Sequence, residues 1–409
     1  MKVLFLASYL TIINDKYFKK NVTGYGYQVR DIADYVSRAG VDVDVVTSAI
    51  TEGRNYNNTT ILKKTWKDIF QHMEPFYFKK MIQLIKIYHP SYIRIIKMLY
   101  YFLSAGYVEY ILKNGNYDIA HIHGIGFSTK PYIDCCEKLG KRYILTLHGL
   151  NSFSDSVQMA SGEKKFEKDF LQYAYKKGVP LTVISTGILN VIKGYLNVQD
   201  DIKHFHVITN GTNITVKCQD NFDIRQKYEI DKNKRIMLCV GNLSRNKNQL
   251  QIVRAYNLLS GEIKKHLCIL FLGTDTTSGD IKRKIYELGL NDNLILCGNI
   301  SRDEIGSYYA QANYTVLASI SEGFGLSIIE GFVYGLPNLT FSDLDSVEDL
   351  FDEKAMLILS ERSDESLASG ITQMLSADWD REYIKKYAKN FSLERMAEEY
   401  MKIYRDIVE

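Results

Sequence analysis

The sequence predicts an α/β protein built from two domains with parallel sheets. Short β-branched runs alternate with longer helical patterns along the whole chain, which is typical of α/β folds. With 409 residues, the chain is long enough for two or three domains, each with its own core. Its 46% hydrophobic and 24% charged residues are those of an ordinary globular protein.

The first half begins with a strand at residues 2–8, an amphipathic helix at 28–39 and a second strand at 41–47. A lysine- and tyrosine-rich segment follows at about 60–113, and its pattern is mostly helical. Further strands are predicted at 118–123, 143–148, 181–185 and 204–208. We expect residues 1–208 to form the first domain.

The second half repeats the alternation of strands and helices. Strands are predicted at 235–240, 268–272, 294–297, 314–317 and 337–340, with helices at 281–288 and 302–311 between them. The pattern at 393–408 is that of a strongly amphipathic helix. We expect a second domain at 209–390 and a separate helical segment at 391–409.

The most informative motif lies near the end of the second domain. Two carboxylates, Glu322 and Glu330, are eight positions apart, and a glycine-rich turn between them runs into a helix. Such a turn directs backbone N–H groups and a helix N-terminus at one point, which suits an anion. Carboxylates on either side would accept hydrogen bonds from sugar hydroxyls. The combination predicts a nucleotide-sugar site.

This motif resembles the E-x7-E signature of retaining GT-B glycosyltransferases, the group 1 family. The resemblance runs in order along nearly the whole chain and is most specific in the second half. It implies two Rossmann-like domains facing each other across a cleft, with the last helix crossing back onto the first domain. It also implies a UDP- or GDP-linked sugar donor and a glycan or lipid-linked glycan acceptor, with retention of stereochemistry.

Within the resemblance, Glu330 would bind the donor ribose and Glu322 would face the donor sugar. Backbone N–H groups for the sugar and diphosphate would come from Gly323, Phe324, Gly325 and Leu326. Two alternatives remain open. Ser327 and Glu330 have the spacing of a capping box, and Glu322 could instead be a solvated residue of a surface loop.

Lys247 follows the predicted strand that ends at Gly241, where the family places a lysine for the donor diphosphate. The position of the usual family arginine is Asn242, so Arg245 is expected to supply the guanidinium instead. Gly273, after another strand, resembles a turn that borders the nucleotide base. We expect Lys247, Arg245 and Glu322 to be catalytic and the two glycines to line the donor site.

Four positions of the first domain complete the resemblance. Gly24 and Gly26 resemble a glycine loop between the first strand and helix, which lets the backbone approach the diphosphate and acceptor. His148 matches a histidine that points at the transferred sugar, whereas His123 has a weaker claim. Asn210 lies in a segment that resembles the junction between the two domains.

No metal site is expected. Asp42 and Asp44 have the D-x-D form of metal-dependent transferases but lie within an alternating strand, and Asp343 and Asp345 read as loop. Without a metal, Lys247, an arginine and oriented N–H groups would have to meet the leaving-group charge. No cofactor other than the donor substrate is expected.

Basic and aromatic residues are concentrated between residues 63 and 103. This segment has eight Lys or Arg and two acids, Asp68 and Glu74. It resembles a surface that docks on anionic membrane, and the alternative is a helical pair that lines the acceptor side. Because the net charge is only +3, nucleic acid is not an expected partner.

The sequence also gives an expected location. The six cysteines lack metal-ligand spacing, and no signal peptide or uncharged apolar run of membrane length is present. We expect a cytoplasmic protein, with or without peripheral binding to the inner face of the membrane. The expected function is that of a glycosyltransferase in cell-surface polysaccharide biosynthesis. A non-catalytic GT-B subunit and a nucleotide-sugar epimerase remain alternatives.

Overall fold

The chain divides into two compact units, each with its own parallel sheet. The computed structural model describes residues 1–12, 15, 17–18, 24–153, 159–216 and 218–409. Unit 1 comprises Met1–Asn210 together with Leu393–Glu409, and unit 2 comprises Gly211–Ser392. The chain passes from unit 1 to unit 2 after Asn210 and returns to unit 1 after Ser392. Each change of unit lies two residues beyond the boundary expected from the sequence, 208 and 390.

Unit 1 contains an eight-stranded sheet in the order β3-β4-β2-β1-β5-β6-β7-β8. All neighbours pair in parallel except β3 and β4, which form an antiparallel hairpin at the edge. The strands are β1 (Lys2–Ala7), β2 (Asp42–Thr47), β3 (Arg54–Tyr56), β4 (Thr59–Ile61), β5 (Ile119–His123), β6 (Tyr143–Leu147), β7 (Leu181–Val183) and β8 (Phe205–Val207). The hairpin was not predicted from the sequence, because strands of three residues carry almost no periodicity.

Seven helices of the described part of unit 1 precede the crossing to unit 2. They are α1 (Gly24–Arg38), α2 (Trp66–Gln71), α3 (Pro75–Tyr88), α4 (Tyr92–Asn114), α5 (Lys130–Leu139), α6 (Ser161–Lys177) and α7 (Thr186–Leu196). The segment predicted to be helical is therefore α2, α3 and α4. Helix α4 packs against α2, α3 and α5, and α3 also contacts α6.

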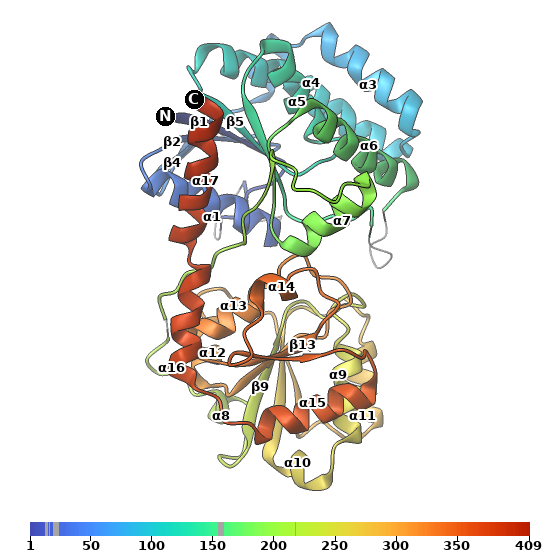
Figure 1. Cartoon of the computed structure of the whole chain (residues 1–409), viewed down its shortest axis with the longest axis vertical. Coiled ribbons are helices and arrows are strands. Elements are labelled where there is room, and N and C mark those ends of the chain that lie inside the picture. Colours follow the sequence, from blue (N-terminus) through green and yellow to red (C-terminus); the bar gives the residue numbers. More distant parts are fainter. Residues whose placement is uncertain (13–14, 16, 19–23, 154–158, 217) are drawn as a thin grey trace. The chain divides into compact units, whose positions relative to one another are not determined.

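The last helix, α17 (Leu393–Val408), belongs to unit 1 and lies beside α1 (Figure 1). Its apolar side buries Met396, Tyr400 and Tyr404 in one core with Phe5 of β1 and Val29 of α1. The amphipathic pattern of the sequence therefore predicted the helix, and the family resemblance implied its return to the first domain.

Unit 2 is a six-stranded parallel sheet in the order β11-β10-β9-β12-β13-β14. The strands are β9 (Arg235–Val240), β10 (Leu267–Leu272), β11 (Leu294–Gly298), β12 (Tyr314–Val316), β13 (Asn338–Phe341) and β14 (Met356–Leu359). Its helices are α8 (Ile224–Lys227), α9 (Gln249–Leu258), α10 (Gly261–His266), α11 (Asp280–Glu287), α12 (Ile305–Gln311), α13 (Leu326–Val333), α14 (Val347–Leu350), α15 (Asp364–Ser376) and α16 (Arg381–Tyr387). Helices α9, α11 and α15 cover one core, and α8 and α12 cover a second one (Figure 1).

In each sheet, the chain adds strands first on one side of a central strand and then on its other side, so that the direction of the crossovers reverses at this strand. In unit 1 this strand is β1, which pairs with β2 on one side and β5 on the other. In unit 2 it is β9, which pairs with β10 and β12. Open α/β sheets bind ligands at the carboxyl ends of strands at such switch points. The loops after β1 and β5, and after β9 and β12, are therefore where binding residues are expected.

One helix of the described residues, α4, is long and apolar enough to cross a membrane by length and composition alone. More than half of its most apolar stretch is buried against the rest of unit 1, as in the core helices of many folded domains. On this ground α4 carries no evidence for a membrane span.

Candidate functional site

In unit 2, an ion pair joins the two loops at the switch point. The Lys247 ammonium, in the loop after β9, donates to the Glu322 carboxylate, in the loop after β12. The Ser319 hydroxyl donates to the same carboxylate oxygen at 3.3 Å. Both charged side chains are partly exposed, at 25% and 19%, so a ligand has access to them. The structure thus brings together two residues that the sequence separates by 75 positions.

Several hydrogen bonds hold these two loops in place. Asn246 accepts from the Ile320 backbone N–H at 2.7 Å through its carbonyl, and its side-chain amide donates to the Ser321 carbonyl at 2.9 Å. Arg362 donates to the carbonyls of Ala318 and Ser319 and binds the Asp343 carboxylate with two nitrogens. The carboxylate-bearing loop is therefore fixed from both sides.

Two glycines allow the loops after β9 and β10 to lie close together. Gly273 has φ = +153°, and a Cβ atom there would lie 2.2 Å from the Gly241 carbonyl oxygen. Gly241 has φ = +138°, and its Cβ would lie 3.5 Å from the Lys247 side chain. A side chain at either position would strain the backbone, and one at Gly273 would also clash with the backbone of Gly241. Both glycines therefore shape the surroundings of the predicted donor site.

Helix α13 begins next to Glu322. Its N-cap is Gly325, whose φ of +69° is the left-handed region that favours glycine, and no side chain caps this end. Residues 323–326 therefore form a turn that leads into a helix N-terminus, as predicted. The side chain of Phe324 is buried and packs near Phe391, so Phe324 can offer a ligand only its backbone.

The capping-box alternative for Glu330 is wrong. Ser327 lies inside α13, after the Gly325 N-cap, and therefore cannot serve as the capping residue. The Glu330 carboxylate instead accepts a hydrogen bond of 3.0 Å from the Tyr309 hydroxyl of α12. Tyr309 is buried, and burial together with the neighbouring Glu330 raises the pKa of its hydroxyl well above the usual range. The phenol thus stays a donor that fixes the carboxylate.

Asn242 and Arg245 differ in their surroundings. The side-chain oxygen of Asn242 accepts from the Thr274 N–H at 3.2 Å, so it ties the loop after β9 to the loop after β10. Arg245 is exposed, and its side chain makes no ion pair with another described residue. The structure leaves the Arg245 guanidinium available without placing it on Glu322 or Lys247.

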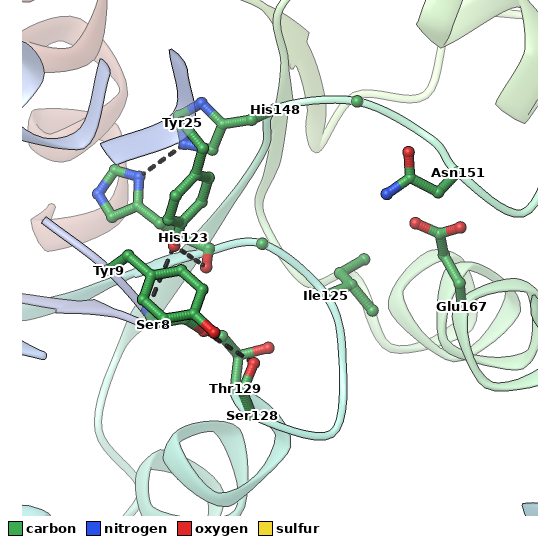
Figure 2. A pocket seen from close by; sticks show the side chains of 12 residues that line it. Ser8, Tyr9, Tyr25, His123, Ile125, Ser128, Thr129, His148, Asn151 and Glu167 are labelled. Carbon is green, nitrogen blue, oxygen red and sulfur yellow. Dashed lines mark hydrogen bonds between the residues drawn. The ribbon is translucent and has the colours of Figure 1, made fainter. Parts of the chain in front are cut away.

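Unit 1 has a cavity of about 390 Å³ at its own switch point (Figure 2). It is lined from the loops after β1, β5 and β6, and from helices α1 and α6. The lining residues are Ser8, Tyr9, Tyr25, His123, Gly124, Ile125, Ser128, Thr129, His148, Gly149, Asn151 and Glu167. His148 and His123 both belong to this cavity, so the structure places the predicted histidine in a site.

Three imidazoles are stacked beside the cavity. The ring centroids of His121 and His123 are 4.1 Å apart, and those of His123 and His148 are 5.3 Å apart. His123 Nδ1 and His148 Nε2 share a hydrogen bond of 3.1 Å. Burial lowers the pKa of His148 to about 4, and it lowers the pKa of the other two well below their usual range. All three are therefore neutral near pH 7.

The predicted glycine loop at Gly24 and Gly26 is helical instead. Helix α1 already begins at Gly24, so both glycines lie in its first turn. A Cβ atom at Gly26 would lie 2.2 Å from the Thr11 hydroxyl, and the Gly26 carbonyl accepts from the Thr11 N–H at 3.1 Å. Gly26 therefore permits close packing of Thr11 on the helix, which explains the glycine without a ligand.

Asn210 is the last residue of unit 1 before the crossing into unit 2, and it is buried. Two residues further on, the Thr212 N–H donates to the Phe391 carbonyl at 2.8 Å. The outgoing and returning segments are thus hydrogen-bonded to each other within unit 2. The predicted junction lies where the chain changes units.

Among the described residues, no group of three or more His, Cys, Asp or Glu side chains could hold a metal ion. Asp44 accepts from the Tyr117 hydroxyl at 2.6 Å and pairs with Lys2, within β2 as predicted. Asp343 is bound by Arg362. Both D-x-D motifs therefore have structural partners.

Two family models together match most of the chain. The model for glycosyl transferases group 1 matches residues 220–391, and the model for glycosyltransferase family 4 matches residues 22–216. The chain belongs to the group 1 glycosyltransferases. The matched ranges include the loops after β5, β6, β9 and β12, whereas Ser8 and Tyr9, which follow β1, lie before the first matched residue.

Relatives of this group 1 chain include enzymes named for glycan assembly. An N-acetylgalactosaminyltransferase of Campylobacter jejuni that acts on a diphospho-undecaprenol substrate is 26% identical over 47% of this chain and 52% of its own length. The O-antigen chain mannosyltransferase B of Escherichia coli is 26% identical over 44% of this chain and 48% of its own. An uncharacterized glycosyltransferase of Methanocaldococcus jannaschii is 25% identical over 52% and 55%. The chain thus spans about half the length of these relatives.

Solved structures confirm the GT-B fold. A glycosyltransferase from Rickettsia africae matches 100% of this chain and 98% of its own, with a TM-score of 0.71 and 18% identity. Sucrose-phosphate synthase from Thermosynechococcus elongatus matches 100% and 99%, with a TM-score of 0.73 and 17% identity. The fold class expected from the sequence is therefore confirmed.

Sequence patterns missed several residues of the two sites in this group 1 chain. Arg362 binds the Ser319 carbonyl in the loop that carries Glu322, and Tyr309 of α12 holds Glu330, although neither residue belongs to a sequence motif. Asn151 and Glu167 line the unit 1 cavity from a loop and from α6. Glu167 is 4% exposed, and a glutamate this buried usually has a specific role, but the burial is visible only in the structure.

Proposed function

We propose that the chain is a retaining, metal-independent hexosyltransferase. It would transfer a sugar from a UDP- or GDP-linked donor to a glycan or lipid-linked glycan, in cell-surface polysaccharide biosynthesis. Unit 2 would bind the donor, and unit 1 would bind the acceptor. The observation that carries this proposal is the Lys247–Glu322 ion pair at the switch point of unit 2, beside the uncapped N-terminus of α13.

The surroundings of that pair suit a sugar diphosphate. The ammonium of Lys247 and the N–H groups at the start of α13 are donors for a diphosphate. Glu330 lies one to two turns further along α13 and is held by Tyr309, which suits an acceptor for the ribose diol. The names of the relatives, which include lipid-linked and O-antigen acceptors, support an acceptor of the same class.

A donor screen tests this proposal directly. Binding of UDP and GDP is measured first by calorimetry, and turnover of UDP- and GDP-hexoses is then measured with and without EDTA. We expect one nucleotide to bind, its sugar donor to be hydrolysed or transferred, and EDTA to have no effect. Loss of turnover in EDTA with recovery on Mn²⁺ or Mg²⁺ would overturn metal independence. Absence of any nucleotide binding would overturn the transferase itself.

The role of the missing family arginine is tested by one substitution. We propose that Arg245 supplies the guanidinium that Asn242 lacks. Arg245→Ala would then lower turnover much as Lys247→Ala does, because both charges oppose the charge on the leaving diphosphate. A kinetically silent Arg245→Ala would show that Arg245 is a solvated loop residue.

A non-catalytic GT-B subunit is the second candidate, and the presence of Asn242 at the usual arginine position favours it. Such a subunit would retain the fold and would stabilise a partner transferase. Donor hydrolysis by the purified chain separates the two candidates, because a subunit without activity leaves every donor intact.

We also propose that helices α2, α3 and α4 bring the chain to an anionic membrane. Their outer side exposes large apolar residues, among them Tyr92 at 77%, Ile93 at 69% and Phe70 at 59%. Lysines of the same helices are exposed as well: Lys67, Lys79, Lys86 and Lys97. Aromatic and aliphatic side chains with lysines around them suit the interface of an anionic bilayer.

Liposome flotation tests the membrane proposal. The variant replaces Lys67, Lys79, Lys86 and Lys97 with Glu, and the matched control replaces four exposed lysines of unit 2, Lys232, Lys265, Lys282 and Lys386. We expect wild type and control to float with anionic vesicles at low salt, and the variant to remain unbound. Flotation should weaken with salt. Equal flotation of all three proteins would instead assign this surface to the acceptor.

A further inference from the structure

The unit 1 cavity has the size and the surfaces of a sugar site. At about 390 Å³, it lies near the lower end of the range for small-molecule pockets, roughly 300–1,000 Å³. The Tyr9 and Tyr25 rings are arranged edge to face, with centroids 6.5 Å apart. Such rings offer an apolar surface to the C–H face of a pyranose. The Ser128 hydroxyl, which accepts from the Ser8 hydroxyl at 2.7 Å, can still donate its own hydrogen to a ligand.

The charge of the lining is unusual for a site on a basic chain. Of the described residues that line the cavity, none is a lysine or an arginine, and one, Glu167, is acidic. The imidazoles of His123 and His148 are neutral near pH 7 because burial lowers the pKa of each. An anionic ligand would therefore meet a carboxylate and no compensating cation.

Glu167 is fixed in its position. It lies on α6 with 4% of its surface exposed, and its carboxylate accepts from the Ser152 backbone N–H at 2.6 Å. Figure 2 shows the Asn151 amide and the Glu167 carboxylate facing each other on one side of the cavity, with Ile125 between them and the histidines. The carboxylate can accept hydrogen bonds from sugar hydroxyls, and the amide can both donate and accept.

We infer that this cavity binds an uncharged sugar residue of the acceptor and that Glu167 excludes acidic sugars. The inference rests on the proposed role of unit 1 in acceptor binding. It follows from the juxtaposition of an immobile carboxylate with hydroxyl, amide and aromatic groups, in a site whose described lining has no cation. A carboxylate or phosphate on the ligand would lie near a like charge, which is a strong means of rejecting wrong partners.

Matched pairs of methyl glycosides test the inference. Methyl glucoside and methyl glucuronide differ only at C6, as do the galactose pair, and methyl N-acetylglucosaminide and methyl mannoside extend the neutral set. Their affinities are measured by saturation-transfer-difference NMR at pH 8 on the full chain. We expect at least one neutral glycoside to bind about tenfold or more tightly than its uronide. Equal binding of the pairs, or no neutral glycoside binding, would overturn the inference.

Three variants separate the role of Glu167 from general effects. Glu167→Gln keeps the shape of the side chain and should bring the affinities for the neutral sugar and its uronide closer together. Asn151→Asp adds a carboxylate and should move these affinities further apart, which keeps the test valid if Glu167→Gln fails to fold. Asp169 lies on the same helix but outside the lining, and its carboxylate accepts from the Tyr88 hydroxyl. Asp169→Asn should therefore leave the ratio of affinities unchanged. Equal ratios in wild type, Glu167→Gln and Asn151→Asp would contradict the role of Glu167.

The same samples distinguish this inference from the proposed function. Under the proposed function, calorimetry with UDP and GDP measures the donor site of unit 2. If a nucleotide binds but the sugar preference is absent, the inference on the acceptor class fails and the transferase stands. If neutral sugars bind as expected but no nucleotide does, the transferase fails and the cavity remains a neutral-sugar site.

Discussion

The candidate sites of the two units occupy the same topological position and differ in their chemistry. Unit 2 places an ion pair, Lys247 and Glu322, in the loops that flank β9 and β12. Unit 1 places neutral imidazoles and hydroxyls at the ends of β1, β5 and β6, and one fixed carboxylate on α6. The sheet topology determines where a ligand binds, and the loop residues determine which ligand it is. Under the proposals above, unit 2 accordingly binds a charged ligand and unit 1 binds a neutral polar ligand.

The largest expected effect, a loss of turnover at the charged site of unit 2, is at Lys247. Under the proposed function, Lys247→Ala should lower kcat by about 10²- to 10³-fold, because the ammonium stabilises charge that grows on the diphosphate in the transition state. The measurement is steady-state donor turnover, with Lys265→Ala, an exposed lysine of α10, as the control. If Lys247→Ala keeps most of its turnover, the charged character of the unit 2 site is not catalytic.

A smaller loss is expected for Glu330, which should affect binding and not the fold. Glu330→Gln removes an ionised hydrogen-bond acceptor and should weaken nucleotide binding by about 10- to 100-fold. Calorimetry gives the affinity, and thermal unfolding gives the stability. Tyr309→Phe removes only the hydroxyl that holds Glu330 and should have the smaller effect on affinity. Unchanged affinity together with lower stability in Glu330→Gln would assign Glu330 a purely structural role.

Acid should destabilise unit 1 more than unit 2, because the buried bases lie in unit 1. Burial lowers the folded-state pKa of His148 from 6.5 to about 4, so the unfolded chain binds more protons between these values. The stability of unit 1 should therefore fall as the pH falls from 6.5 towards 4. Lys64, buried and donating to the Thr47 carbonyl at 2.6 Å, has its pKa lowered to about 7. For the same reason, Lys64 should lower the stability of unit 1 progressively as the pH falls from 10.5 to 7.

The chain offers a separate probe for each unit, because its two tryptophans are Trp66 in unit 1 and Trp379 in unit 2. Single-tryptophan variants should show that unit 1 loses on the order of 1–3 kcal/mol more than unit 2 between pH 7 and pH 5. Unit 2 has a single histidine, His266, which is exposed. Lys64→Met should remove the alkaline part of the unit 1 response. Parallel losses in both units would show that carboxylates, and not the buried bases, govern the acid response.

The smallest expected effect is at Arg362, which acts on Glu322 through the loop that it binds. Arg362→Lys keeps the charge but cannot bind two carbonyls and the Asp343 carboxylate together, because lysine lacks the planar fork. We expect kcat to fall about two- to tenfold with little change in the KM for the donor. Arg254→Lys, which pairs with Asp364 on the α9–α15 side of unit 2, is the control. A change in KM alone would place Arg362 in donor binding.

The sequence predicted what periodicity and motif spacing can carry. The parallel sheets and the final helix follow from patterns within short windows, whereas a shared site for Lys247 and Glu322 was implied by the family resemblance. It failed where tertiary packing overrides a local pattern. Gly24 and Gly26 looked like a loop, although Gly26 serves the close packing of Thr11 on α1. Ser327 and Glu330 had capping-box spacing, although Gly325 is the N-cap.

The residues that no pattern revealed are those that act across long sequence distances. Arg362 reaches the carbonyls of Ala318 and Ser319 from more than 40 positions away, and Tyr309 reaches Glu330 from another helix. Glu167 enters the unit 1 cavity from α6, whereas the loops of that cavity follow β1, β5 and β6. Such contacts depend on how helices pack onto the sheet, which a single sequence does not encode locally.

The return of α17 to unit 1 sets an order for folding during synthesis. Unit 2 is one continuous segment, so all of its residues are available as soon as Ser392 has emerged from the ribosome. The core of unit 1 needs Met396, Tyr400 and Tyr404, and His121 of β5 shares a hydrogen bond of 2.6 Å with the Tyr404 hydroxyl. Domains near the N-terminus generally fold first during translation. Here unit 1 is translated first but is completed last. Part of its core stays exposed until unit 2 and then α17 have been synthesised.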